Sequence, residues 1–178
     1  MANTGNRPKP QGQHPLYEVP LPYPKVFTGS MNPAYGRAML SNVGGINSEM
    51  SAVSLYLYNH FVTPQYPEIS EAFRKMAEAE MRHLEIFGTL AYQLGQDPRL
   101  WSNRCGQRTY WTPGYHRYPV QLPRMLGYAL ESERAAIQKY QRQAEMIQDE
   151  NIRENLRRII LDEEAHVEFL RYLKGKYA

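Results

Sequence analysis

The chain has 178 residues, of which 42% are hydrophobic, and its formal net charge is +3 at pH 7. This length is typical of one globular domain, and the mild charge, with no basic stripe, gives no indication of nucleic-acid binding. The single cysteine excludes an intrachain disulfide and a four-cysteine iron–sulfur or rubredoxin-type centre.

The first segment, residues 1–34, carries seven of the thirteen prolines. Proline disrupts a helix, so this segment is predicted to be an extended arm that is loose at its start. Apolar residues between the prolines of "PLYEVPLPYPKVF" indicate packing on the body or on a neighbouring subunit, and a disordered tail is the alternative. No stretch resembles a signal peptide or a membrane span, so we expect a soluble, cytoplasmic protein without a membrane partner.

The second segment, residues 35–178, is predicted to be all-α, because its apolar residues recur with helical spacing and no strand-like alternation competes. Four helices are expected, the first already starting at the end of the arm: from about Pro33 to Val62, Pro67 to Leu94, Leu122 to Ile147 and Ile152 to Leu173. The predicted core face of the first helix contains Ile46, Glu49, Val53, Tyr56 and His60.

The lengths of the connections predict the topology. Short links make the first two helices antiparallel neighbours, and likewise the last two. The link between the second and third helices is long enough to run the length of a bundle, since an extended chain covers ~3.3 Å per residue and a helix only 1.5 Å. One long crossover between helices two and three is the ferritin-like four-helix bundle.

Each predicted helix carries a carboxylate where its core face should be apolar. These residues are Glu49, Glu80, Glu133 and Glu163. No lysine or arginine lies on the same predicted core faces to pair with them. Burying four unpaired carboxylates together would be very costly, so the pattern indicates that cations compensate them.

Two of these glutamates are followed three residues later by a histidine, giving Glu80–His83 and Glu163–His166. The i, i+3 spacing places both side chains on one face of a helix. Two glutamates from two helices, with one Glu-x-x-His from each of the other two, form the ligand set of di-iron and di-manganese bundles. We therefore predict a site for two divalent metal ions; four solvated acids with two satisfied core histidines is the alternative.

The spacings also repeat along the chain. Glu49 and Glu80 are 31 positions apart, and Glu133 and Glu163 are 30 apart. Tyr56 and Tyr140 each follow a glutamate by seven positions, as core tyrosines or as hydrogen-bond donors to metal ligands. The chain thus reads as two helical hairpins, each supplying half of a site.

These motifs resemble those of the ferritin-like superfamily, within it the rubrerythrins and especially the manganese catalases and their spore-coat relatives. "GGINSEMSAVSLYLYNHF" resembles the opening of the manganese-catalase first helix, and "EAEMRHLEIF" the Glu-x-x-His stretch of the second. The likeness implies that Glu163 acts either as a metal ligand or as a catalytic base. It also implies a homo-oligomer, and it leaves a spore-associated location open.

Carboxylates with imidazoles suit Mn or Fe better than Zn or Ca, and both metals change oxidation state, so H₂O₂ or O₂ is the expected substrate. Three functions compete: removal of peroxide as a catalase or peroxidase, oxidation of iron with reduction of O₂, and a structural role in which metal holds the bundle together. A peroxidase would need an external electron donor, whereas disproportionation of peroxide needs none. We expect removal of peroxide by a catalase- or peroxidase-like reaction, and a chain with one cysteine fits the catalase-like reaction.

The sequence gives less specific predictions for polar residues outside the predicted metal ligands. His60 is expected to be a satisfied core histidine, and surface pairing is expected for Arg82, Arg134 and His116, with support of the metal ligands as the alternative. Cys105 is expected to be a buried free thiol. The aromatic crossover that contains it is predicted to cover the site or to form a subunit interface.

Overall fold

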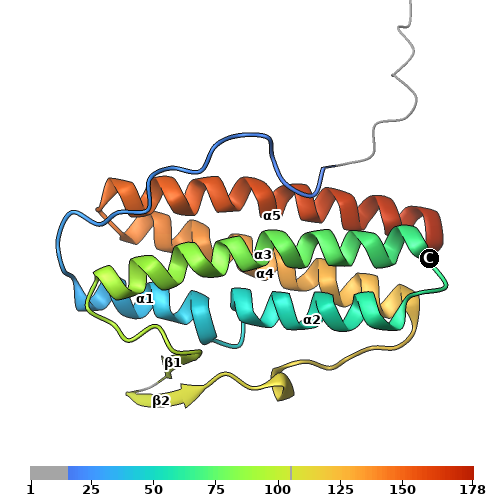
Figure 1. Cartoon of the computed structure of the whole chain (residues 1–178), viewed down its shortest axis with the longest axis horizontal. Coiled ribbons are helices and arrows are strands. Elements are labelled where there is room, and N and C mark those ends of the chain that lie inside the picture. The colour runs from blue at the N-terminus through green and yellow to red at the C-terminus, as the bar shows by residue number, and fades with distance from the viewer. Residues whose placement is uncertain (1–15, 105) are drawn as a thin grey trace, which may run out of the picture.

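The computed structural model describes residues 16–104 and 106–178 and confirms an all-α, ferritin-like bundle (Figure 1). Within these residues the helices are α1 (Pro33–Gly44), α2 (Glu49–Val62), α3 (Pro67–Gln93), α4 (Leu122–Met146) and α5 (Glu150–Tyr177). The elements between α3 and α4 are the strands β1 (Trp101–Arg104) and β2 (Gln107–Tyr110) and the short 3₁₀ helix η1 (Pro113–Tyr115). α2 packs mainly on α3, and α4 on α5, as the short links predict.

Local sequence signals start several of these helices. α1 and α3 have proline in the first turn, where its missing N–H costs no hydrogen bond. The side chains of Asn32, Ser48 and Asp149 accept hydrogen bonds from backbone N–H groups that begin α1, α2 and α5.

The prediction of one continuous first helix is wrong, because the chain breaks between Gly44 and Glu49 into α1 and α2. Ile46, predicted to face the core, is 55% exposed in this break. A Cβ on Gly44 would lie 2.2 Å from the backbone nitrogen of Trp101, so only glycine lets the crossover approach this closely. Glu49 consequently becomes the first residue of a new helix.

The crossover runs from the end of α3 to the start of α4 along the outside of α1 and α2, as its length predicts (Figure 1). The expectation that no strands form is wrong here, since β1 and β2 pair as an antiparallel hairpin. The indole of Trp111, beyond the hairpin, donates to Ser51 Oγ at 3.1 Å and ties the crossover to α2.

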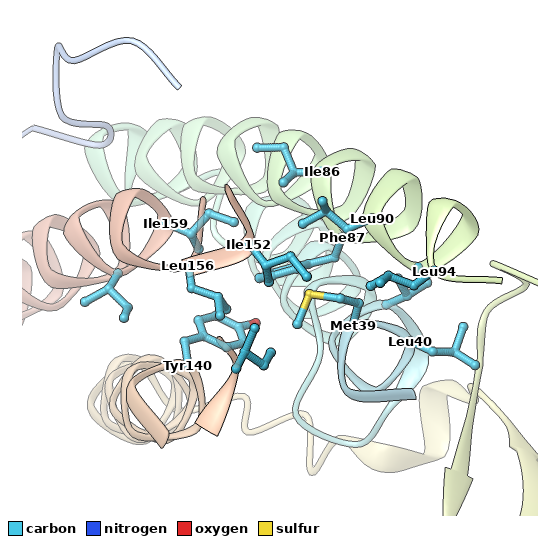
Figure 2. Close-up of a cluster of buried hydrophobic side chains, with 14 of the residues drawn as sticks. Met39, Leu40, Ile86, Phe87, Leu90, Leu94, Tyr140, Ile152, Leu156 and Ile159 are labelled. Carbon is cyan, nitrogen blue, oxygen red and sulfur yellow. The ribbon is translucent and has the colours of Figure 1, made fainter. Parts of the chain in front are cut away.

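Two apolar clusters fill the bundle. The first, shown in Figure 2, joins α1 and the end of α3 to the start of α5, with Met39, Phe87 and Leu156 among its members. The second lies among α2, the start of α3, the start of α4 and the end of α5, and includes Phe73 and Leu126. The carboxylates and histidines predicted from the sequence fall in the helices between these two clusters.

The described part of the arm, residues 16–32, lies along the outside of α5 and α3 (Figure 1). The ring of Tyr17 is 4.5 Å from that of Phe169, and the Thr28 N–H donates to Gln93 Oε1 at 3.0 Å. The prediction that the arm packs on the body is therefore confirmed for this part. The arm's loose start and the thiol of Cys105 lie outside the described residues. Among the helices that are described, none has the length and apolar character needed to cross a membrane.

Candidate metal centre

The structure brings all six predicted side chains together in the middle of the bundle. Glu49 begins α2, Glu80 and His83 lie on α3, Glu133 on α4, and Glu163 and His166 on α5. None is more than 2% exposed. None of the four glutamates points into solvent, so each lies on the core face that the helical spacing of the sequence predicts.

The two histidines turn the same ring nitrogen, Nδ1, toward the carboxylates. His83 Nδ1 lies 3.2 Å from Glu80, 3.3 Å from Glu163 and 3.8 Å from Glu49. His166 Nδ1 lies 3.1 Å from Glu80, 3.3 Å from Glu163 and 3.5 Å from Glu133. Each imidazole therefore faces two shared carboxylates and one of its own.

These contacts define two overlapping groups of metal-donor atoms. The first is Glu49, Glu80, His83 and Glu163, and the second is Glu80, Glu133, Glu163 and His166; within each group the donor atoms lie within 4.8 Å of one another. Glu80 and Glu163 belong to both groups. Carboxylate and imidazole donors in this arrangement suit a pair of Mn or Fe ions.

Unsatisfied polar atoms support this fit. Glu80 Oε1, both carboxylate oxygens of Glu163 and both ring nitrogens of His166 are buried without a hydrogen-bond partner within the described residues. Buried polar atoms normally have a partner, and each one without it costs free energy. Atoms left open around a common centre fit ligands of a metal ion, so a buried Glu/His cluster that can hold metal is present.

The pKa values of the four glutamates shift in opposite directions: two are raised and two are lowered. Burial raises the pKa of Glu49 well above its ordinary value and that of Glu133 to about 8, with neighbouring carboxylates adding to both shifts. Burial and neighbouring carboxylates oppose ionisation of Glu80 and Glu163 too, but the close imidazole rings of His166 and His83 outweigh them and lower both pKa values. Despite burial, the carboxylates raise the pKa of both histidines. The raised pKa values keep protons within the cluster and so reduce the repulsion between its carboxylates.

Each of the two hairpins is tied to the glutamate of the other by a tyrosine. Tyr56 on α2 donates to Glu133 on α4, and Tyr140 on α4 donates to Glu49 on α2. Both tyrosines are buried. The reading of these residues as hydrogen-bond donors to the predicted ligands is therefore the one that the geometry supports, although the crossed pairing was not predicted.

Sequence reasoning missed Asp162, which is fully buried beside His83. Its Oδ2 lies 3.2 Å from His83 Nε2 and 2.6 Å from Arg158 Nη1. The Tyr23 hydroxyl, from the arm, donates to the same oxygen at 2.6 Å. Burial opposes ionisation of Asp162, but hydrogen bonds from His83, Arg158 and Tyr23 hold its pKa well below the ordinary value. The i, i+4 spacing of Arg158 and Asp162 was the available signal.

The cluster opens toward the crossover through a cavity of about 240 Å³. All four glutamates of the cluster line its inner end, and His116 and Tyr128 are among the residues that line the rest. Burial lowers the pKa of His116. His116 thus borders the path to the site, whereas it was expected to pair at the surface.

The other polar residues weighed from the sequence lie away from the cluster. His60 Nδ1 is 2.9 Å from the Ser70 carbonyl oxygen, so it is a satisfied histidine at the edge of the core. Arg82 Nη1 lies 2.5 Å from Glu18, which confirms surface pairing. Arg134 is exposed.

The comparisons with known proteins agree with this geometry. The family model described as Rubrerythrin matches residues 44–174, which include all six cluster residues. Protein CotJC of Bacillus subtilis (strain 168) is 28% identical over 82 residues, or 46% of this chain. The match spans only 42% of CotJC, less than half of that protein's length.

Solved structures share the fold at low sequence identity. KatB, a manganese catalase from Anabaena, is 22% identical with a TM-score of 0.78, and the match covers 90% of this chain and 80% of KatB. Rhodobacter capsulatus bacterioferritin is 20% identical with a TM-score of 0.66, over 83% of this chain and 88% of that one. A dodecameric thioferritin from Bacteroides fragilis is 19% identical with a TM-score of 0.64, over 83% of this chain and 89% of that one.

Proposed function

Because this chain belongs to the rubrerythrin family, we propose that its buried cluster binds two Mn or Fe ions and removes hydrogen peroxide. The observation that carries the proposal is the sharing of Glu80 and Glu163 between two groups of donor atoms. Two ions that share ligands can act together on one small substrate. The cavity that reaches all four glutamates gives such a substrate access.

Each side chain has a role in this proposal. Glu49 and His83 would hold one ion, Glu133 and His166 the other, and Glu80 and Glu163 would reach both. When bound, the ions would supply the two-electron redox change by which two H₂O₂ become two H₂O and one O₂. Tyr56 and Tyr140 orient Glu133 and Glu49 through their hydrogen bonds.

Glu163 is the candidate for proton transfer. It lines the inner end of the cavity, where a peroxide molecule would arrive. Its two carboxylate oxygens are also 3.3 Å from His83 Nδ1 and 3.3 Å from His166 Nδ1. This position between the imidazoles favours a ligand role, and the same carboxylate can accept a proton from a substrate in the cavity.

The test is metal analysis of protein purified without added metal, followed by measurement of O₂ with an electrode after H₂O₂ is added. We expect about two ions per chain and O₂ release at half the rate of peroxide loss, as the disproportionation stoichiometry requires. His83→Ala and His166→Ala should each abolish the release. Evolution of O₂ that survives in both variants would place the chemistry elsewhere.

A second candidate is oxidation of Fe²⁺ with reduction of O₂, which the fold shared with bacterioferritin favours. The same electrode distinguishes the two, because an iron oxidase consumes O₂ when Fe²⁺ is added and evolves none from peroxide. Peroxide loss that requires an added reductant would indicate a peroxidase with an external electron donor. Two bound ions with none of these activities would leave the structural role, and assembly into a homo-oligomer remains part of the proposal.

A further inference from the structure

The two halves of the cluster differ in what holds their histidines. His83 Nε2 lies 3.2 Å from Asp162 Oδ2 and 3.3 Å from the Tyr23 hydroxyl. His166 Nε2 is buried and has no hydrogen-bond partner within the described residues. An imidazole whose second nitrogen donates to a carboxylate has a fixed tautomer and ring orientation, which strengthens metal binding at the first nitrogen.

The support behind His83 comes from the N-terminal arm. Tyr23 donates to Asp162 Oδ2 at 2.6 Å, and the Val19 N–H donates to Asp162 Oδ1 at 2.8 Å. Both oxygens of Asp162 are therefore held by a segment that lies far from it in the sequence. Asp162 is fully buried with the arm in place, and the arm supplies a hydrogen-bond donor to each of its two oxygens.

Arg158 fixes the arm in this position. Its Nη2 donates to the carbonyl oxygens of Val19 at 2.7 Å and Leu21 at 2.9 Å, while Nη1 lies 2.6 Å from Asp162. The guanidinium also lies 4.3 Å from the centre of the Tyr23 ring. One buried arginine thus joins the arm, the aspartate and, through the aspartate, the histidine.

We infer that Tyr23 is a positioning residue for the metal position of Glu49 and His83 and leaves the position of Glu133 and His166 unaffected. Through Asp162 it holds His83 Nδ1 toward the carboxylates. The arm therefore controls the affinity of one ion of the pair, and the two ions bind with different affinities. This inference rests on the proposed binding of two metal ions.

The test is titration of the metal-free full chain with Mn²⁺, followed by equilibrium dialysis and by the electron paramagnetic resonance of the bound ions. Tyr23→Phe removes the hydroxyl and keeps the ring beside Arg158. The matched control is Tyr17→Phe, which removes a hydroxyl from the same arm at a ring that packs on Phe169. We expect Tyr23→Phe to weaken one of the two ions by roughly tenfold or more and Tyr17→Phe to weaken neither.

Histidine variants identify the position affected. In the His166→Ala background, where the His83 position remains, Tyr23→Phe should weaken the remaining ion by the same factor. In the His83→Ala background it should have no effect. The wild-type spectrum should show coupled ions, whereas Tyr23→Phe at limiting Mn²⁺ should show more of the signal of isolated ions.

The outcomes separate the two proposals. Equal weakening of both ions by Tyr23→Phe, no weakening of either, or equal losses in Tyr17→Phe would each overturn the inference while leaving the metal pair intact. A wild-type chain that binds no Mn²⁺ or Fe²⁺ would instead overturn the proposed function.

Discussion

The phenol of Tyr140 on α4 donates a hydrogen bond to the carboxylate of Glu49 on α2, so each hairpin helps to hold a predicted metal ligand of the other. Tyr56 and Glu133 make the reciprocal bond. These two bonds join the hairpins through the interior of the bundle, where both partners are buried. The ligand sets are therefore products of the assembled bundle, and neither hairpin can form one alone.

Loss of this bond should be measurable as stability. Tyr140→Phe leaves the Glu49 carboxyl buried without its donor, which should cost about 1–3 kcal/mol in the metal-free protein. Chemical denaturation of the chelated chain measures the change. The control Tyr58→Phe alters a ring that packs against Tyr118 away from the cluster and should change stability by less than about 0.5 kcal/mol. Equal effects in the two variants would contradict a special role for the bond.

The break between α1 and α2 should depend on Gly44. Gly44→Ala places a methyl group where the backbone of Trp101 lies, so the crossover must move, and we expect a loss of about 1–3 kcal/mol. Gly88→Ala is the matched control, because a Cβ there meets nothing within 4 Å and alanine is the better helix former. Thermal melts of both variants test this, and a stable Gly44→Ala protein would refute the steric account.

Metal loading should release protons. In the metal-free protein, burial raises the pKa of Glu133 to about 8 and the carboxylates raise the pKa of both histidines above 6.5, so these three groups carry protons near pH 6. Burial raises the pKa of Glu49 as well. Binding two divalent ions to four carboxylates and two neutral imidazoles should release about three protons per chain at this pH, one from Glu133 and two from the histidines, besides any that Glu49 holds. Calorimetric titration in buffers of different ionisation enthalpy counts them. Release of fewer than about two would show that protons do not balance the metal-free core.

The metal-free protein should lose stability as pH rises from about 5 to about 8. The pKa of Glu133 rises from 4.5 to about 8 on folding, so the folded chain binds more protons in this window and the unfolding free energy falls with pH. The raised histidine pKa values act in the same direction above about 6.5. Lys139, whose pKa burial lowers to about 7, opposes the trend only above that value.

Urea denaturation at several pH values checks this for chelated and Mn²⁺-loaded protein. The loaded chain should show a much smaller fall over this window, because metal replaces the protons. Identical pH profiles for the two forms, or equal melting temperatures with and without chelator, would count against a structural contribution from metal.

Glu163 and Glu49 should differ in the number of ions they affect. Glu163 belongs to both donor groups, so Glu163→Gln should weaken both ions, whereas Glu49→Gln should weaken one. Elemental analysis after dialysis measures the stoichiometry, and O₂ evolution measures the activity. Full occupancy in Glu163→Gln with turnover slowed ~10²-fold would assign Glu163 as a base and not a ligand.

The helix period determined which polar residues gather in the core. In an α-helix, residues with the spacing of the apolar positions lie on the same face as those positions. This spacing is shared by Glu80, Glu133, Glu163 and the two histidines. Short and long links determined which helices are neighbours. The bundle and the gathering of these five side chains could therefore be predicted from the sequence, whereas the position of Glu49 at the start of a new helix could not.

What the sequence left open depends on contacts between segments that are far apart along the chain. Asp162 lies beside the core face of α5, but its hydrogen bonds come from the arm that covers it and its ion pair from Arg158. The break after Gly44 follows from the position of Trp101, more than 50 residues later. Helix periodicity reports only which face of a helix is buried, so such contacts, and with them the support of His83, were decided by the tertiary structure alone.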